Sequence, residues 1–199
     1  SSMGNSSTAY AQLMNNIPGL KMSLFTGSEF QHRVNYEDTD QIQPFILQDG
    51  SFVEAFDCAA EYASKHGYTS ERGFFNPGRR AGLKLAFFEA TDQIDADIDW
   101  YVQAVSSAMG VYGTYKGARE LQQIGHIKKL PHLLCVQQES CSPMVKAWQE
   151  NAEQIESRHI VEHRQGLTKA ILRGNTSRVY PYMRSIINDN HGGLMAVHE

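Results

Sequence analysis

Short apolar runs alternate along the chain with longer stretches in which apolar residues recur every three or four positions. Runs of about four to eight residues rich in aliphatic, β-branched and aromatic side chains are typical of buried strands. They predict strands at residues 20–25, 44–48, 98–105, 132–138 and 194–198. Because helical stretches separate these runs, the pattern predicts an α/β fold, a three-layer α/β/α arrangement around a mostly parallel, twisted sheet.

Helices are predicted between the strands, at residues 8–15, 51–67, 80–94, 111–125 and 179–190. In the second of these, Ser51 and Glu54 have the spacing of a capping box, and Gly67 is placed to end the helix. Its predicted apolar face consists of Phe52, Phe56, Ala59, Ala60 and Ala63. Two polar segments, at about residues 26–43 and 149–170, interrupt the alternation and predict loops or insertions.

The composition narrows the class of protein. A chain of 199 residues with 41% hydrophobic and 20% charged residues is typical of a soluble globular protein of one domain or slightly more. Its net charge of -4 gives no electrostatic reason to expect a nucleic acid or an anionic membrane as partner. No apolar run approaches the roughly 20 residues of a membrane-spanning helix, and no signal-peptide pattern is present. Cys58, Cys135 and Cys141 are widely spaced and odd in number, which favours a reducing, cytoplasmic setting over a disulfide framework.

The first residues of the chain form a turn with the composition of an anion-binding loop. In parallel sheets, ligands bind where turns lead into helices, beyond the carboxyl ends of the strands. Gly4 permits a close approach of the backbone. Hydroxyl and amide groups from Ser2, Asn5, Ser6 and Ser7 add to the free N–H groups of a helix start. A carboxylate or a phosphate would suit this turn; the alternative is that Ser and Asn only cap the helix.

A second turn of small residues follows the predicted strand at 98–105. Ser106, Ser107, Ala108 and Gly110 lead from that strand into the predicted helix at 111–125. Backbone amides in such a turn can hold an anion, although the sequence is neither a Walker loop nor the GxGxxG motif of dinucleotide-binding proteins. Two such turns in one α/β chain predict a ligand with an anionic group at each end.

Taken together, these segments resemble the pyridoxal phosphate (PLP) enzymes of the tryptophan-synthase β fold, called fold type II, on the branch of threonine synthase and cysteate synthase. Residues 2–7 are similar to that family's Ser-Ser/Thr-Gly-Asn turn, and 104–137 to its phosphate loop with the helix and strand that follow. Residues 50–67 and 173–193 resemble further segments in the same order. In residues 74–90 the family's Asn-Pro and Glu-Gly-x-Lys stretch is matched by Asn76, Pro77, Gly82, Lys84 and Glu89.

The resemblance implies PLP as cofactor and assigns roles to both turns. Asn5 is assigned to the ring hydroxyl of the cofactor. The substrate carboxylate is assigned to the turn of Ser2, Met3, Gly4 and Ser6. The cofactor phosphate is assigned to Ser106, Ser107, Ala108, Met109 and Gly110. The expected reaction is elimination of an activated group from an amino acid and replacement by a nucleophile, with PLP as electron sink.

The resemblance also implies a choice of substrates and a homodimer. Chemistry like that of threonine synthase would act on O-phosphohomoserine, and chemistry like that of cysteate synthase on O-phosphoserine. Arg33, Arg79 and Arg80 are candidates for contacts with the substrate phosphate, with a plain surface role as the alternative. Tyr112 and Tyr115 could reach the substrate or pack in the core.

The chain departs from the family at several positions. Met3 stands where the family has small or hydroxyl residues, and Ala81 where the threonine synthase pattern has Glu. Ser106 and Ala108 occupy positions where glycine is expected, so that side chains of Ala108 and Met109 stand where the backbone must approach the phosphate.

No lysine of the chain matches the family's Schiff-base lysine, which lies upstream of the Ser-Gly-Asn turn. We therefore expect residues 1–199 to be the central part of a longer enzyme and to be inactive alone. Residues 1–75 would contribute to the half that binds the substrate carboxylate, and residues 76–199 to the half that binds the cofactor phosphate. The lysine and the C-terminal part of the enzyme would lie outside this sequence.

Two other functions remain open on the sequence. A relative that keeps the scaffold without the chemistry would be a binding or regulatory protein. A zinc hydrolase is suggested by residues 159–163, which have the form His-x-x-Glu-His. On a helix, His159 and His163 would share one face with Glu162 as the base, but the surrounding sequence is strongly polar.

Overall fold

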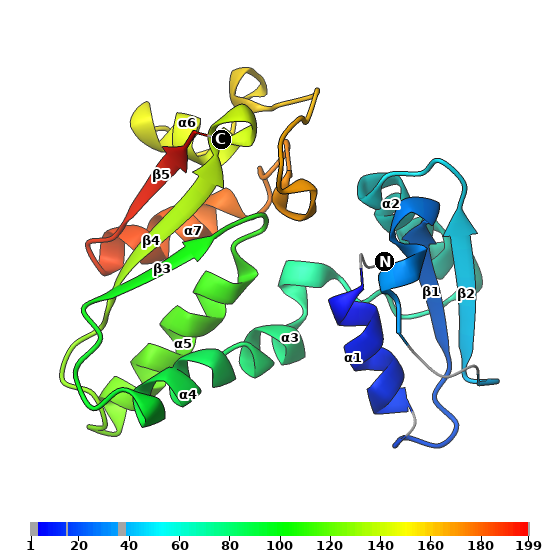
Figure 1. Ribbon diagram of the computed structural model, residues 1–199, viewed down its shortest axis with the longest axis horizontal. Coiled ribbons are helices and arrows are strands. Elements are labelled where there is room, and N and C mark those ends of the chain that lie inside the picture. The colour runs from blue at the N-terminus through cyan, green and yellow to red at the C-terminus, as the bar shows by residue number, and fades with distance from the viewer. Residues whose placement is uncertain (1–3, 15, 36–38, 199) are drawn as a thin grey trace. The chain divides into compact units, whose positions relative to one another are not determined.

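The computed structural model describes residues 4–14, 16–35 and 39–198, apart from the side chains of Asn5 and Ala170. The chain forms two compact units, Ser1–Glu71 and Arg72–Glu199. Figure 1 shows that each unit has its own sheet and its own helices. None of the helices in the described parts of the chain is long and apolar enough to cross a membrane.

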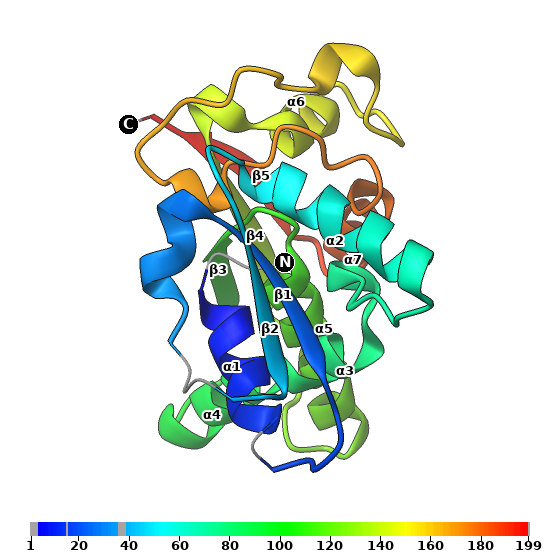
Figure 2. The ribbon, with the colours of Figure 1, turned by 90° about the vertical axis from the view of Figure 1, so that its right-hand side faces the viewer.

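The first unit is built on a pair of parallel strands. It contains α1 (Asn5–Met14), β1 (Met22–Gly27), the 3-10 helix η1 (Ser28–Arg33), β2 (Ile42–Leu47) and α2 (Phe52–His66). β1 and β2 run side by side, with Met22 opposite Ile42 and Gly27 opposite Leu47 (Figure 2). Ala11 and Met14 of α1 form a small core with Leu24 and Ile42.

Helix α2 begins and ends as its sequence predicts. The Ser51 hydroxyl accepts the Glu54 N–H at 3.3 Å, and the Glu54 carboxylate accepts the Ser51 N–H at 2.7 Å, so the capping box is complete. Gly67 ends the helix in the left-handed region, with φ 68°. The prediction for the apolar face is wrong at one position: Ala60 is exposed, and Ala55, which the prediction omitted, is fully buried. The buried face of α2 therefore includes Ala55 and leaves out Ala60.

The second unit contains a parallel sheet of three strands in the order β3–β4–β5. Its elements are η2 (Gly73–Phe75), α3 (Pro77–Gly82), α4 (Leu85–Gln93), β3 (Trp100–Ala104), α5 (Met109–Gln123), β4 (His132–Gln138), η3 (Glu139–Cys141), α6 (Pro143–Gln149), η4 (Ser157–His159), η5 (Lys169–Ile171), α7 (Tyr180–Asp189) and β5 (Gly193–Val197). All the predicted strands are present, and their parallel pairing confirms the α/β fold. They divide between two sheets, one in each unit.

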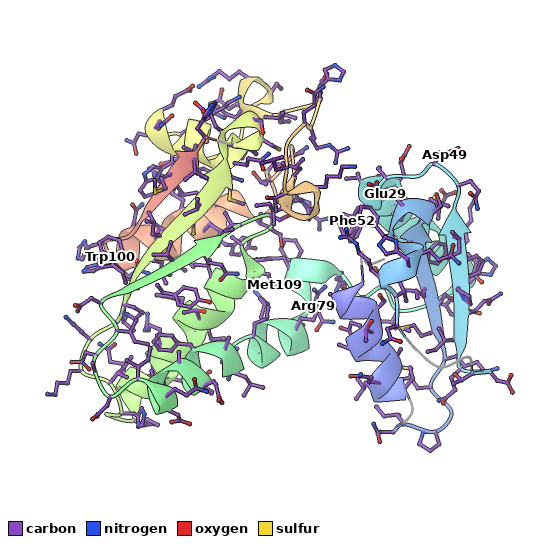
Figure 3. The ribbon with its side chains drawn as sticks, in the orientation of Figure 1. Glu29, Asp49, Phe52, Arg79, Trp100 and Met109 are labelled. Atoms are coloured by element: carbon purple, nitrogen blue, oxygen red, sulfur yellow. The ribbon has the colours of Figure 1, made fainter. Side chains whose placement is uncertain are left out.

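The two faces of the β3–β4–β5 sheet differ. Leu133, Cys135 and Leu194 are buried in a core that includes residues of α5, α6 and α7. Side chains on the opposite face include Trp100, which is 52% exposed, and Val102, which is 60% exposed. Figure 3 labels Trp100 at the start of β3.

The predicted helix at residues 80–94 is two helices, and it starts earlier. The Asn76 side chain accepts the Arg79 N–H at 3.1 Å, so α3 begins at Pro77. The break between α3 and α4 follows Gly82, and Leu83 packs there against α5: a Cβ on Gly113 would lie 2.6 Å from the Leu83 Cβ. The close approach of the two segments therefore depends on glycine at position 113.

Candidate cofactor site

The turn between β3 and α5 brings the predicted phosphate-binding residues together. The Val105 N–H donates to the carbonyl of Val136 at 2.9 Å, which fixes the end of β3 against β4. Ser106 and Ser107 follow, both partly buried, and the chain turns into α5 through Ala108. Ala108 has φ 54° and ψ 21°, a left-handed conformation that glycine adopts without strain. The position where the family resemblance expects glycine is thus one where the backbone favours glycine.

The start of α5 offers its amides to a ligand. No side chain within the described part of the chain caps this helix. The Tyr112 N–H donates to the carbonyl of Ala108 at 3.0 Å, so the N–H groups of Met109, Gly110 and Val111 belong to the first turn and have no partner within the helix. These amides and the positive end of the helix dipole favour an anion. Figure 3 marks Met109 at this helix start.

Gly110 lies against a side chain that sequence reasoning missed. A Cβ on Gly110 would stand 2.4 Å from Nε2 of Gln103, a β3 residue. The Gln103 Oε1 atom is buried without a hydrogen-bond partner among the described residues. Gln103 shares a face of the strand with Tyr101 and Val105, which is the signal in the sequence that places it inward. The glycine therefore lets β3 and the first turn of α5 come close enough to form this turn.

The end of β4 lies beside the same turn and also carries glutamines. Gln137 is 1% exposed, and its Oε1 accepts the N–H groups of Met144 at 2.9 Å and Val145 at 3.3 Å. This side chain caps α6, a helix that the sequence analysis did not predict. Gln138 follows, and its Oε1 accepts the Thr168 N–H at 3.1 Å. The carboxyl end of β4 is therefore held by contacts with later parts of the chain.

The first predicted turn lies in the other unit. Ser2 and Met3 are outside the described residues, as is the side chain of Asn5. Gly4 is buried with φ 135°, and its carbonyl accepts the Thr8 N–H at 2.9 Å and the Ser7 hydroxyl at 2.7 Å. Ser6 follows in the first turn of α1 and is partly buried. The structure thus brings Gly4 and Ser6 together at the start of α1.

The candidate arginines have different surroundings. Arg33 is exposed, and its guanidinium lies 5.5 Å from the Phe30 ring centre. Arg79 lies on α3, where Figure 3 labels it. Arg80 is half-buried, with its guanidinium carbon 5.2 Å from the centre of the Tyr112 ring. Arg80 thus contacts a residue of α5.

Tyr115 is engaged away from the turn. Its hydroxyl donates to the carboxylate of Asp189 and accepts from Arg119 at 3.0 Å. Partial burial, followed by the bond to Asp189, raises the pKa of Tyr115 above its ordinary value. This side chain ties α5 to α7, which favours the packing role over contact with a substrate.

The zinc interpretation rested on a helix that does not form. His159 ends the 3-10 helix η4, and residues 160–163 are irregular. His159 is 1% exposed: its Nδ1 accepts the Glu156 N–H at 3.0 Å and its Nε2 lies 3.0 Å from Glu150, so both ring nitrogens are engaged. His163 is exposed. No cluster of metal-ligating side chains is found in the described segments. The prediction that His159, Glu162 and His163 share a helix is therefore wrong.

A family model described as pyridoxal-phosphate dependent enzyme matches residues 37–199. The chain belongs to this family. It is 29% identical over 138 residues to the cysteate synthase of Methanospirillum hungatei, an alignment that covers 69% of this chain and 33% of that protein. It is 33% identical over 101 residues to the threonine synthase of Mycobacterium bovis, covering 50% of this chain and 28% of that protein. The aligned parts of the chain thus span about a third of the length of these relatives.

The fold points in the same direction. A solved structure of threonine deaminase isoform 2 from Solanum lycopersicum superposes with a TM-score of 0.62 at 16% identity, covering 96% of this chain and 59% of that chain. The resemblance to fold type II PLP enzymes is therefore confirmed, and the family implies PLP as the cofactor. The uncapped start of α5 fits a phosphate group.

Proposed function

We propose that this chain is the central part of a PLP-dependent lyase or synthase that carries out elimination and replacement on an activated amino acid. Two substrates are proposed. O-phosphohomoserine would be used as by a threonine synthase, and O-phosphoserine as by a cysteate synthase. The relatives with these two names support the class of reaction, and the fold supports the cofactor.

The observation that carries the proposal is the turn from β3 into α5. Ala108 turns the backbone in the left-handed region, and the first-turn amides of α5 follow without a side-chain cap from the described residues. Such amides hold a phosphate without any charged side chain. We propose that Ser106, Ser107, Ala108, Met109 and Gly110 hold the phosphate of PLP. The cofactor, when bound, supplies an electron sink for negative charge at the α-carbon of the substrate.

The first unit would bind the substrate carboxylate and the ring hydroxyl of the cofactor. We propose that Ser2, Met3, Gly4 and Ser6 bind the substrate carboxylate and that Asn5 donates to the ring hydroxyl of the cofactor. The φ of 135° at Gly4 and its buried position support a turn whose backbone is specialised rather than a plain helix cap. The task of these residues would be to fix the α-carbon relative to the ring.

The roles of the site residues are assigned from the family's motifs, and the homodimer is inferred from the same resemblance. We propose a homodimer in the cytoplasm, where the reducing setting agrees with the free state of Cys58, Cys135 and Cys141. Residues 1–75 and 76–199 would form the carboxylate-binding and phosphate-binding halves.

A comparison of phosphorylated and unphosphorylated amino acids tests the proposal. The full-length protein, loaded with PLP, would be offered O-phosphohomoserine, O-phosphoserine, homoserine and serine, with release of inorganic phosphate and formation of amino-acid products measured. We expect phosphate release from one of the phosphorylated substrates and no turnover of homoserine or serine. A protein that binds PLP but releases phosphate from neither substrate would instead be a binding or regulatory relative.

A further inference from the structure

A cation without a counter-charge lies beside the first turn of α5. Arg80 belongs to α3, and its guanidinium carbon lies 5.2 Å from the ring centre of Tyr112 and 5.6 Å from that of Phe74. Tyr112 and Phe74 are themselves in edge contact, with ring centres 5.3 Å apart. The two rings therefore fix the place of the guanidinium without neutralising it.

Arg80 has no acidic partner within the described residues. Its side chain makes neither an ion pair nor a hydrogen bond there, although it is half-buried. By contrast, Lys84, one turn further along, pairs with Glu120 at 2.7 Å. A half-buried guanidinium carries donors that need an acceptor, and a planar pair of donors matches a phosphate.

Tyr112 connects Arg80 to the phosphate-binding turn. Its N–H donates to the Ala108 carbonyl at 3.0 Å, so it closes the first hydrogen-bonded turn of α5. Long side chains on a helix point back toward its N-terminus, which directs the ring of Tyr112, and Arg80 with it, toward the helix start. The amides of Met109, Gly110 and Val111 are at this same end.

The composition of the turn from β3 into α5 explains why a charged residue such as Arg80 would be needed beside it. Ala108 and Met109 bring side chains to positions where the family resemblance expects a backbone free to approach phosphate. A turn with fewer glycines offers a less adaptable set of amides. A charged donor beside it would restore affinity, because hydrogen bonds from a charged group to phosphate are stronger than those from amides.

We propose that Arg80 binds the phosphate group of PLP, together with the first-turn amides of α5. The proposal rests on the proposed function, since it needs PLP at this helix start. It assigns α3 a direct part in holding the cofactor, with Tyr112 and Phe74 as the residues that position the guanidinium.

Pyridoxal, which lacks the phosphate, separates this role from a structural one. Dissociation constants of PLP and of pyridoxal would be measured by absorbance titration of the full-length protein freed of cofactor. Arg80→Met keeps an apolar stem against both rings but removes the charge. We expect PLP to bind about 10- to 100-fold more weakly and pyridoxal to bind unchanged, because only the phosphate contact is lost.

Arg178→Met is the matched control. Arg178 also lies over a ring of this aromatic cluster, 4.8 Å from the centre of Phe75, but it is exposed. Its loss removes the same net charge, and we expect the affinity for PLP to stay within about twofold, since exposed charges are screened. Arg80→Lys keeps the charge and a long stem. We expect it to lose PLP affinity by roughly three- to tenfold, again without a change in the affinity for pyridoxal. Arg80→Lys therefore tests the proposal if Arg80→Met does not fold.

The outcomes separate the two proposals. Equal losses for PLP and pyridoxal, or no loss for PLP, in the Arg80 variants would overturn the role of Arg80 and leave the proposed function standing. A loss in Arg178→Met as large as that in Arg80→Met would also overturn it. A wild-type protein that binds no PLP would overturn both the role of Arg80 and the proposed function.

Discussion

Gly4 and the backbone of Arg33 lie so close that a Cβ atom on Gly4 would stand 2.8 Å from the carbonyl oxygen of Arg33. Gly4 also has φ 135°, a backbone angle that residues with a side chain rarely adopt. Position 4 at the start of α1 therefore requires glycine for two reasons, its backbone conformation and its close contact with Arg33.

Gly4→Ala should disrupt the start of α1. We expect a loss of about 2 kcal/mol or more in the free energy of unfolding, because both backbone strain and a backbone clash are introduced. Urea unfolding measures this loss. Gly19→Ala is the control: Gly19 has φ 83°, but a Cβ there would meet nothing within 4 Å, so it carries the strain without the clash. Equal effects of the two substitutions would show that the contact with Arg33 does not matter.

Ala108→Gly should improve binding of PLP. Glycine removes the strain of the left-handed conformation and the Cβ from the turn, while it loses one buried methyl group. The two effects on stability are each about 1 kcal/mol and opposed, so we expect little change in thermal unfolding. Absorbance titration should show a PLP dissociation constant several-fold lower than that of the wild type. Weaker binding in a variant of unchanged stability would contradict the role assigned to this turn.

Gly113→Ala should destabilise the second unit, although alanine is the better helix former. A Cβ at Gly113 would lie 2.6 Å from the Leu83 Cβ and 3.0 Å from the Leu83 carbonyl carbon, so we expect a loss of about 1–3 kcal/mol. Gly82→Ala is the matched helical control. A Cβ at Gly82 meets nothing within 4 Å, and we expect a gain of up to about 1 kcal/mol from helix propensity. Thermal or urea unfolding of both variants checks the difference in sign, and a stabilised Gly113→Ala variant would rule out the tight packing.

Much of this architecture could be predicted from local patterns. The strands follow from short apolar runs, and the ends of α2 follow from Ser51, Glu54 and Gly67, because those residues act within a single turn. The start of α3 at Pro77 also has a local signal, the Asn76–Pro77 pair, which the predicted range of 80–94 overlooked.

The remaining features depend on contacts between segments. Helix α6 is seven residues long, and it is capped by the side chain of Gln137 from β4, so periodicity alone gives little sign of it. The surroundings of His159 come from Glu150 and Glu156, whose contacts replace the expected helix. In the candidate site, the order of motifs identified the turns, but the place of Arg80 against Tyr112 arises only when α3 packs on α5.

His159→Ala should destabilise the protein because buried contacts are lost, and the loss should not depend on a bound metal ion. The substitution leaves the Glu156 N–H without its acceptor and a cavity in a buried position, for which we expect a loss of about 2–4 kcal/mol. His163→Ala, at an exposed position, should change stability by less than about 0.5 kcal/mol. Unfolding by urea, with metal analysis of the purified protein, tests both points. Stoichiometric zinc that is lost with both substitutions would contradict this account.

The cysteines should differ in reactivity. Burial raises the pKa of the Cys135 thiol to about 12 and that of Cys141 above its ordinary value, so both hold less of the reactive thiolate at any given pH. Cys58 is exposed. In a chromogenic thiol assay of the native protein near pH 8, Cys58 should react quickly, and Cys135 and Cys141 only after denaturation. Rapid labelling of Cys135 in the folded protein, located by mass spectrometry, would be inconsistent with its buried position.

Binding of PLP tests the central claim most directly. The full-length protein, freed of cofactor, would be titrated with PLP while its visible absorption is recorded, and then treated with borohydride. The account predicts saturable binding of one equivalent per chain, with an absorption band that borohydride abolishes as the cofactor becomes fixed to the protein. A folded full-length protein that develops no such band and retains no cofactor would contradict it.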